Sequence, residues 1–103
     1  MKKVEIGGQE RPIRFSYLAL KDICNKCGLK LSEMNQLGSE IEHIGIITYY
    51  GLKAGAKKIG EPFKYKITDI EDWLDNEAFS KIGEILESFQ LDQPQNDPQI
   101  GGK

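Results

Sequence analysis

The residues with the clearest chemical potential are Cys24 and Cys27, which form a Cys-x-x-Cys pair in the stretch "KDICNKCG". This spacing occurs in redox dithiols and in zinc sites. A redox dithiol lies at the N-terminus of a helix, where the dipole lowers the thiol pKa, whereas this pair falls in the last turn of an expected helix. A zinc site needs about four ligands, and the chain has one histidine and no third cysteine. We therefore expect two reduced cysteines that belong to the core.

The single histidine, His43, is the other candidate for chemistry, because an imidazole can serve as an acid or a base. No serine or cysteine nucleophile is suggested beside it, so we expect a surface or capping residue. The acidic run "TDIEDWLDNE" lacks the alternating ligands and the central glycine of a calcium-binding loop. The sequence predicts a protein that is not an enzyme, with no catalytic residues, no metal site and no cofactor.

Composition restricts the class of protein further. A chain of 103 residues forms one small domain, and 39% hydrophobic with 29% charged residues is typical of a folded soluble protein. The net charge of -2 disfavours nucleic acid as a partner. Because no apolar run approaches the roughly 20 residues of a membrane span, we expect a cytoplasmic protein that does not enter membranes. Charge is uneven: residues 53–66 are rich in lysine and residues 69–92 are rich in acid.

The elements that position these residues begin with a predicted β-hairpin. Polar and apolar residues alternate over residues 2–6 and 11–15, and "GGQE" between them supplies a turn. The pattern marks Pro12 as an exposed edge. It places four apolar side chains on one face, which are Val4, Ile6, Ile13 and Phe15.

Serine and threonine mark the starts of the helices that follow. A first helix runs from Ser16 to Gly28, with Tyr17, Leu20, Cys24 and Cys27 as its inward stripe. A short helix starts at Ser32 and ends at Gly38, and the capping-box pairs Ser39 with Glu42 and Thr68 with Glu71 start two more. Asn76 caps a last helix whose apolar stripe is Phe79, Ile82, Leu86 and Phe89.

The long helix that ends near Gly60 is apolar on almost every side from Ile41 to Ile59. Such a helix is either the buried centre of a small domain or is covered by a second subunit. Gly51 and Gly55 have the spacing of a close helix crossing, within the domain or between subunits.

These elements predict one α+β domain over residues 1–91 that is mostly α-helical, with four or five helices and an N-terminal β-hairpin. The segment "EPFKYK" is extended and is an option for one further short strand. Trp73 is expected in the core. Residues 92–103 carry two prolines and two glycines with a single large apolar residue, so they are expected to be a disordered tail.

Three stretches together resemble the tail assembly chaperones of long-tailed bacteriophages and related prophages. They are "IGGQERPIRFSYLALKDICNKCG", "ITYYGLKAGAKKIGEPF" and "ITDIEDWLDN". The shared layout is a hairpin with Arg11, Arg14 and Phe15, a "YYGLKAG" helix, an aromatic extended segment and a "WLD" helix, and it covers about residues 4–89. None of these stretches is a catalytic signature.

The resemblance implies a non-enzymatic function and defined partners. Proteins of this family bind the long helical tape measure protein, keep it soluble, help tail tube protein to polymerise around it, and are absent from the mature virion. Some have a longer product made by ribosomal frameshifting. The resemblance transfers no binding residue to this sequence.

Candidate partner-binding residues are therefore chosen on physical grounds, because a chaperone of this kind needs accessible apolar surface. We name Tyr49, Tyr50 and Lys53 on the long helix, and Ile85 and Phe89 on the outer face of the last helix. The long helix also fits a plain core role. A small DNA-binding regulator is the alternative, with the lysines of residues 53–66 as phosphate contacts, although no segment rich in Arg, Asn and Gln is present for recognition.

Overall fold

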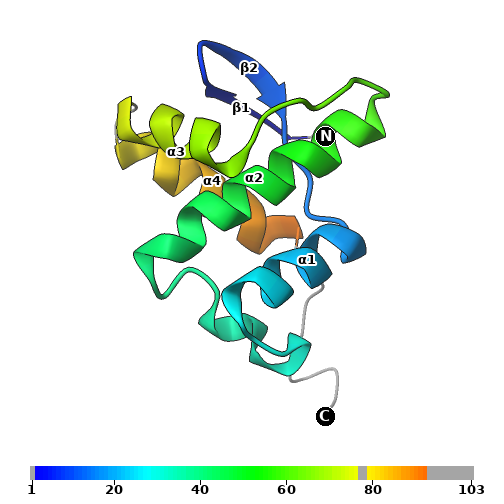
Figure 1. The fold of residues 1–103 in the computed structure, drawn as a ribbon, viewed down its shortest axis with the longest axis vertical. Coiled ribbons are helices and arrows are strands. Elements are labelled where there is room, and N and C mark those ends of the chain that lie inside the picture. The colour runs from blue at the N-terminus through cyan, green and yellow to red at the C-terminus, as the bar shows by residue number, and fades with distance from the viewer. Residues whose placement is uncertain (1, 77–78, 93–103) are drawn as a thin grey trace.

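A long central helix organises the protein, as shown by a computed structural model that describes residues 2–76 and 79–92 (Figure 1). The order is β1 (Lys3–Ile6), β2 (Gln9–Pro12), α1 (Tyr17–Cys27), the 3-10 helix η1 (Leu31–Gln36), α2 (Ile41–Lys58), α3 (Ile67–Asn76) and α4 (Phe79–Asp92). Helix α2 contacts α1, α3, α4 and β2. The prediction of a mostly helical α+β fold with an N-terminal hairpin is confirmed.

The hairpin turns more tightly than predicted. Gly7 and Gly8 form a two-residue turn with φ of 64° and 84°, the left-handed conformation that this kind of turn requires at both positions. The strands are antiparallel, with Ile6 opposite Gln9, so β2 begins at Gln9 and ends at Pro12 rather than at Phe15. The four side chains predicted on one face, Val4, Ile6, Ile13 and Phe15, are all buried.

Helix α1 has the predicted ends. The Ala19 N–H donates to Ser16 Oγ at 3.2 Å, and Gly28 ends the helix in the left-handed conformation with φ 73°. Its inward face is different from the prediction, because Tyr17 is 67% exposed. The buried residues are Ala19, Leu20, Ile23 and Cys24.

In the first turn of η1 and of α3, a carboxylate accepts a hydrogen bond from the backbone N–H of the lysine that precedes the element. The Lys30 N–H donates to Glu33 Oε1 before η1, and the Lys66 N–H donates to Asp69 Oδ2 before α3, both at 2.8 Å. A carboxylate also suits the positive end of a helix. The predicted caps Ser32 and Thr68 are therefore wrong, because both residues lie inside the element that they were expected to start.

The start of α2 depends on His43 rather than on the predicted Ser39–Glu42 capping box. The Gly38 N–H donates to His43 Nδ1 at 3.1 Å, so the buried imidazole satisfies a backbone donor ahead of the helix. Ser39 Oγ instead donates to the Gln36 carbonyl at 2.6 Å. Of the two roles considered for His43, surface and capping, the structure shows capping.

The segments between the later helices contain no strand among the described residues, so the option of a third strand in "EPFKYK" is not realised. Asn76 is the last residue of α3, where its side chain donates to the Asp72 carbonyl at 2.9 Å. It therefore does not belong to the start of α4. Helix α4 includes Asp92, and the rest of the predicted tail, residues 93–103, lies outside the described residues.

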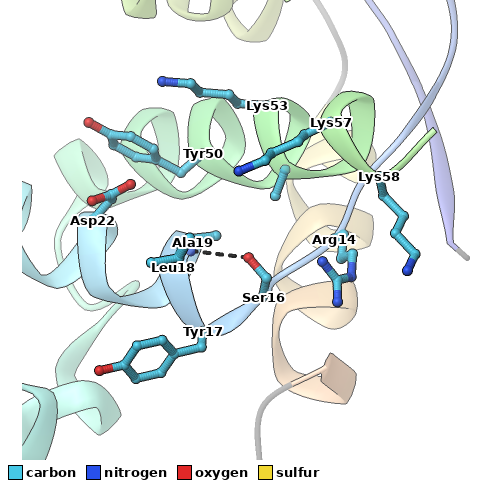
Figure 2. A pocket seen from close by; sticks show the side chains of 11 residues that line it. Arg14, Ser16, Tyr17, Leu18, Ala19, Asp22, Tyr50, Lys53, Lys57 and Lys58 are labelled. Carbon is cyan, nitrogen blue, oxygen red and sulfur yellow. Dashed lines mark hydrogen bonds between the residues drawn. The ribbon is translucent and has the colours of Figure 1, made fainter. Parts of the chain in front are cut away.

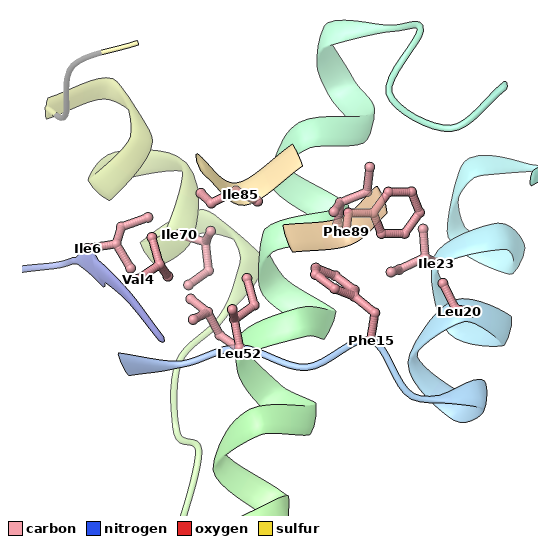
Figure 3. Packing of buried hydrophobic residues seen from close by; sticks show 11 residues of the cluster. Val4, Ile6, Phe15, Leu20, Ile23, Leu52, Ile70, Ile85 and Phe89 are labelled. Carbon is pink, nitrogen blue, oxygen red and sulfur yellow. The ribbon is translucent and has the colours of Figure 1, made fainter. Parts of the chain in front are cut away.

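The core draws side chains from the hairpin and from every α-helix (Figure 3). Ile85 and Phe89 of α4 are 0% and 3% exposed, and the rings of Phe89 and Phe15 meet edge to face with centroids 5.0 Å apart. The prediction that these two residues form an outer face is therefore wrong. Helix α4 contacts β1 and α2, and residues four apart on one helix side point into that contact.

The glycines of α2 allow a strand, rather than another helix, to approach closely. A Cβ on Gly51 would lie 2.6 Å from the Phe15 ring, and one on Gly55 would overlap the Pro12 carbonyl. The Arg14 N–H donates to the Gly51 carbonyl at 3.0 Å. The predicted close approach is present within the domain, and its partner is the end of β2 together with the segment that follows it.

Candidate functional site

A groove of about 640 Å³ separates the first turns of α1 from the second half of α2 (Figure 2). Tyr17, Leu18 and Ala19 line it from α1, and Tyr50 and Ala54 line it from α2. Tyr17 and Leu18 are 67% and 56% exposed. Large apolar side chains that stay accessible beside a groove are typical of a surface that binds a partner.

Local backbone chemistry fixes the shape of this groove. The Ser16 cap sets where α1 begins, and the hydrogen bond from the Arg14 N–H to the Gly51 carbonyl ties the preceding residues to α2. Because α1 buries Ala19 and Ile23 against the core, Tyr17 and Leu18 are left on its solvent side.

Four cationic side chains and one acid line the same groove. The cations are Arg14, Lys53, Lys57 and Lys58, and the acid is Asp22. Figure 2 shows the three lysines on α2, with Arg14 and Lys58 toward one end and Asp22 beside Tyr50 at the other. The lining of the groove therefore combines apolar side chains with a cluster of positive charges.

Tyr50 stays protonated in this setting. Burial raises the pKa of its phenol, and the nearby Asp22 and Tyr49 raise that pKa further. The Lys53 Nζ lies 6.0 Å from the centre of the Tyr50 ring and 5.8 Å from that of Tyr49. The neutral hydroxyl can both donate and accept a hydrogen bond.

The structure separates the five predicted binding residues into three groups. Tyr50 and Lys53 line the groove, and Ile85 and Phe89 belong to the core. Tyr49 packs edge to face on Tyr50 and Phe63, with ring centroids 4.8 and 5.6 Å away. It contacts Tyr50 and is not among the residues that line the groove.

Sequence reasoning missed the contribution of α1 to this surface. The predicted stripe buries Tyr17 and leaves out Leu18, whereas both side chains are exposed in the structure. A signal was present in "YLAL", because a helix that packs on one side cannot bury four consecutive large or apolar residues. Arg14 lies between the buried residues Ile13 and Phe15. The alternation of polar and apolar residues in this segment therefore indicates that Arg14 is exposed.

A second surface, between α2 and α3, has the opposite charge. It encloses about 360 Å³ and is lined by apolar residues together with Glu42, Glu71 and Asp75. Ile41, which was expected to face inward, is 76% exposed at its edge. The two grooves thus present charges of opposite sign on either side of α2.

The cysteines form no reactive pair. Both are free, Cys24 is buried and Cys27 is half-buried, so the core assignment is confirmed for Cys24 and holds in part for Cys27. Burial raises the pKa of each thiol, and Cys24 raises that of Cys27 further. Within residues 2–76 and 79–92, no group of three or more His, Cys, Asp and Glu side chains is placed to hold a metal ion.

Comparison with known proteins gave no match: no protein-family model, curated protein or solved structure is significantly similar to the chain. In the part of the chain that the structure describes, no helix combines the length and the apolar character needed to cross a membrane.

Proposed function

We propose that this protein is a tail assembly chaperone of a bacteriophage or prophage, a non-enzymatic protein that binds the tape measure protein in the host cytoplasm and assists assembly of the tail tube. The resemblance of three long stretches of sequence supports this role. The observation that carries it structurally is the exposure of Tyr17 and Leu18 among the residues that line a groove of about 640 Å³, to which α2 contributes Tyr50.

The groove suits a client that is long and helical. A chaperone keeps such a client soluble by covering its apolar stripe, and a groove between two helices accepts a third helix through apolar anchors at helical spacing. Tyr17, Leu18 and Tyr50 supply large apolar surface for those anchors. Because Tyr17 and Leu18 are already exposed, binding does not require the core to open.

The direct test uses the DNA that flanks the gene. A very long, helix-rich reading frame next to it would encode the client, and that product is expressed with and without this protein. We expect co-expression to raise the soluble fraction of the client and the two proteins to co-purify. A flanking region without such a frame, or a client that remains insoluble, would contradict the proposal.

Matched variants localise the effect on the surface. The double substitution Tyr17→Ser with Leu18→Ser removes two exposed apolar side chains from the groove. Ile41→Ser with Ile59→Ser removes two exposed apolar side chains elsewhere. We expect the first pair to lose client solubilisation and the second to keep it; the reverse pattern would assign the client to another surface.

A DNA-binding regulator is the second candidate, and the four cations of the groove favour it. Phosphate contacts by Lys53 and Lys57 would make the affinity for duplex DNA fall steeply with salt, and each removed contact would lower the slope of log affinity against log salt by about one. Measurements of duplex binding by the Lys53→Ala and Lys57→Ala variants over a range of salt concentrations test this candidate.

A further inference from the structure

We infer that the α1–α2 groove recognises an amphipathic helix whose apolar stripe is flanked by acidic side chains. The inference rests on the proposed function for the identity of the partner protein, and it adds the chemistry of the segment that is bound. Three features of the groove carry it: its length, its apolar lining residues and the placement of its charges.

The length of the groove fits a short helical segment. Its α2 wall runs from Tyr50 to Lys58, which at the rise of an α-helix is about 12 Å, or roughly two turns of a partner helix. Two turns present about three apolar positions on one face. Tyr17, Leu18 and Tyr50 offer three large side chains to receive them.

The charges fix what lies beside that apolar stripe. Lys53 and Lys57 are four residues apart, and therefore one turn apart on the same side of α2. Acidic residues of the partner at the same spacing would pair with both lysines. Arg14 and Lys58 add positive charge at one end of the groove, whereas Asp22 lies at the other (Figure 2), so we expect the partner's acids to be concentrated toward Arg14.

The apolar lining residues of the groove favour a protein segment over nucleic acid. Leu18, Ala19 and Ala54 present hydrocarbon, which gains by contact with apolar side chains and gains nothing from a phosphate backbone. Acidic side chains line the surface on the other side of α2, and the whole chain carries a net charge of -2. A long nucleic acid would extend beyond the groove and be repelled by these negative charges. A helix of about two turns would stay within the groove.

Designed peptides test the inference with the full chain. The first carries leucine at helical spacing flanked by glutamate, the second has lysine in place of each glutamate, and the third has serine in place of each leucine. Fluorescence anisotropy of labelled peptide measures each affinity. We expect the glutamate peptide to bind at least about tenfold more tightly than either of the others, a ratio equal to about 1.4 kcal/mol, and equal binding by the lysine peptide would overturn the inference.

Charge reversal then ties the preference to the groove. Lys53→Glu with Lys57→Glu is expected to abolish binding of the glutamate peptide and to create binding of the lysine peptide. Lys2→Glu with Lys64→Glu makes the same change in net charge at exposed lysines outside the groove and is expected to leave the preference unchanged. Circular dichroism confirms that each variant is folded, and a preference that survives reversal in the groove would refute the assignment.

The outcomes for the client and the peptide are separable. A neighbouring tape measure product that binds while the glutamate peptide does not would overturn the acidic helix and leave the chaperone role. A glutamate peptide that binds while the tape measure product does not would overturn the chaperone role and leave the recognition chemistry. Duplex DNA that competes with the glutamate peptide and binds more tightly would overturn both in favour of a nucleic-acid surface.

Discussion

The guanidinium of Arg11 lies over the indole of Trp73, with its central carbon 4.3 Å from the ring centre. The Tyr65 ring is 4.9 Å from the same carbon. Arg11 is 9% exposed, and its Nε and one terminal nitrogen donate to the Ile6 and Gly7 carbonyls at 2.8 and 3.0 Å. A single buried cation thus joins the hairpin, the segment before α3, and α3 itself.

Replacing Arg11 by alanine is expected to destabilise the fold by about 2–3 kcal/mol, because two carbonyls lose charged donors and two rings lose a cation. Arg11→Lys should be almost as unstable as Arg11→Ala, since an ammonium group cannot donate to both carbonyls in the fixed geometry of a guanidinium. Urea denaturation measures both variants. Arg14→Ala is the control at an exposed arginine, and a loss from Arg14→Ala equal to that from Arg11→Ala would contradict this explanation.

Gly55→Ala is expected to cost about 2–3 kcal/mol of unfolding free energy. The new Cβ would overlap the Pro12 carbonyl, and backbone cannot move away as a flexible side chain can. Gly83→Ala in α4 is the matched control, because a Cβ there has no neighbour within 4 Å, and it should stabilise the protein by about 0.5–1 kcal/mol. Thermal unfolding of the two variants should shift in opposite directions, and a common shift would argue against the clash.

His43→Leu is expected to cost about 1–2 kcal/mol, because the Gly38 N–H loses its acceptor at the start of α2. Ser39→Ala removes only an exposed hydrogen bond and should change stability by no more than about 0.5 kcal/mol. Amide hydrogen exchange gives a local measure, since the Gly38 amide should exchange faster in His43→Leu alone. Unchanged exchange at Gly38 would show that His43 does not cap α2.

Alkylation of the cysteines should be slow at neutral pH and faster as the pH rises above 9. The pKa of both thiols lies above the ordinary value of 9.0 because of burial, and the thiolate is the form that reacts. Cys27, which is half-buried, should react before Cys24, which is buried. Mass spectrometry after timed iodoacetamide treatment resolves the order, and Cys24 reacting first would contradict it.

The same thiols make folding dependent on pH in the alkaline range. A pKa that is higher in the folded state means that the folded protein holds these protons more tightly than the unfolded chain does. Their contribution to stability is therefore complete below the unfolded pKa and is lost as the pH rises through the folded pKa. Urea midpoints at a series of pH values from neutral upward should fall in the wild type and less in Cys24→Ala.

Local chemistry made parts of this fold predictable. The ends of α1 follow from Ser16 and Gly28, because each acts on backbone groups within its own turn. The hairpin follows from alternation and paired glycines. The start of α3 was missed because Lys66 with Asp69 and Thr68 with Glu71 have the same spacing, and the choice between them depends on where the preceding segment places the chain.

The functional surface was less predictable, because exposure depends on tertiary contacts. The spacing of Gly51 and Gly55 indicated a close approach and did not identify what approaches. Ile85 and Phe89 have the same periodicity whether α4 turns them inward or outward. Arg11 was unexpected in the interior, since arginine is rarely buried and its aromatic partners lie more than fifty residues away in the chain.

The contact of Trp73 with Arg11 and Tyr65 also gives the protein an intrinsic optical probe. Trp73 is the only tryptophan of the chain, and its ring centroid lies 4.8 Å from that of Tyr65. Excitation absorbed by Tyr65 will pass to the indole while the two rings stay together, and the emission colour of the indole will report the nearby cation. The signal of the cation is lost when the hairpin leaves α3, whereas the transfer from Tyr65 reports on the segment before α3, so the two separations can be followed by fluorescence without a label.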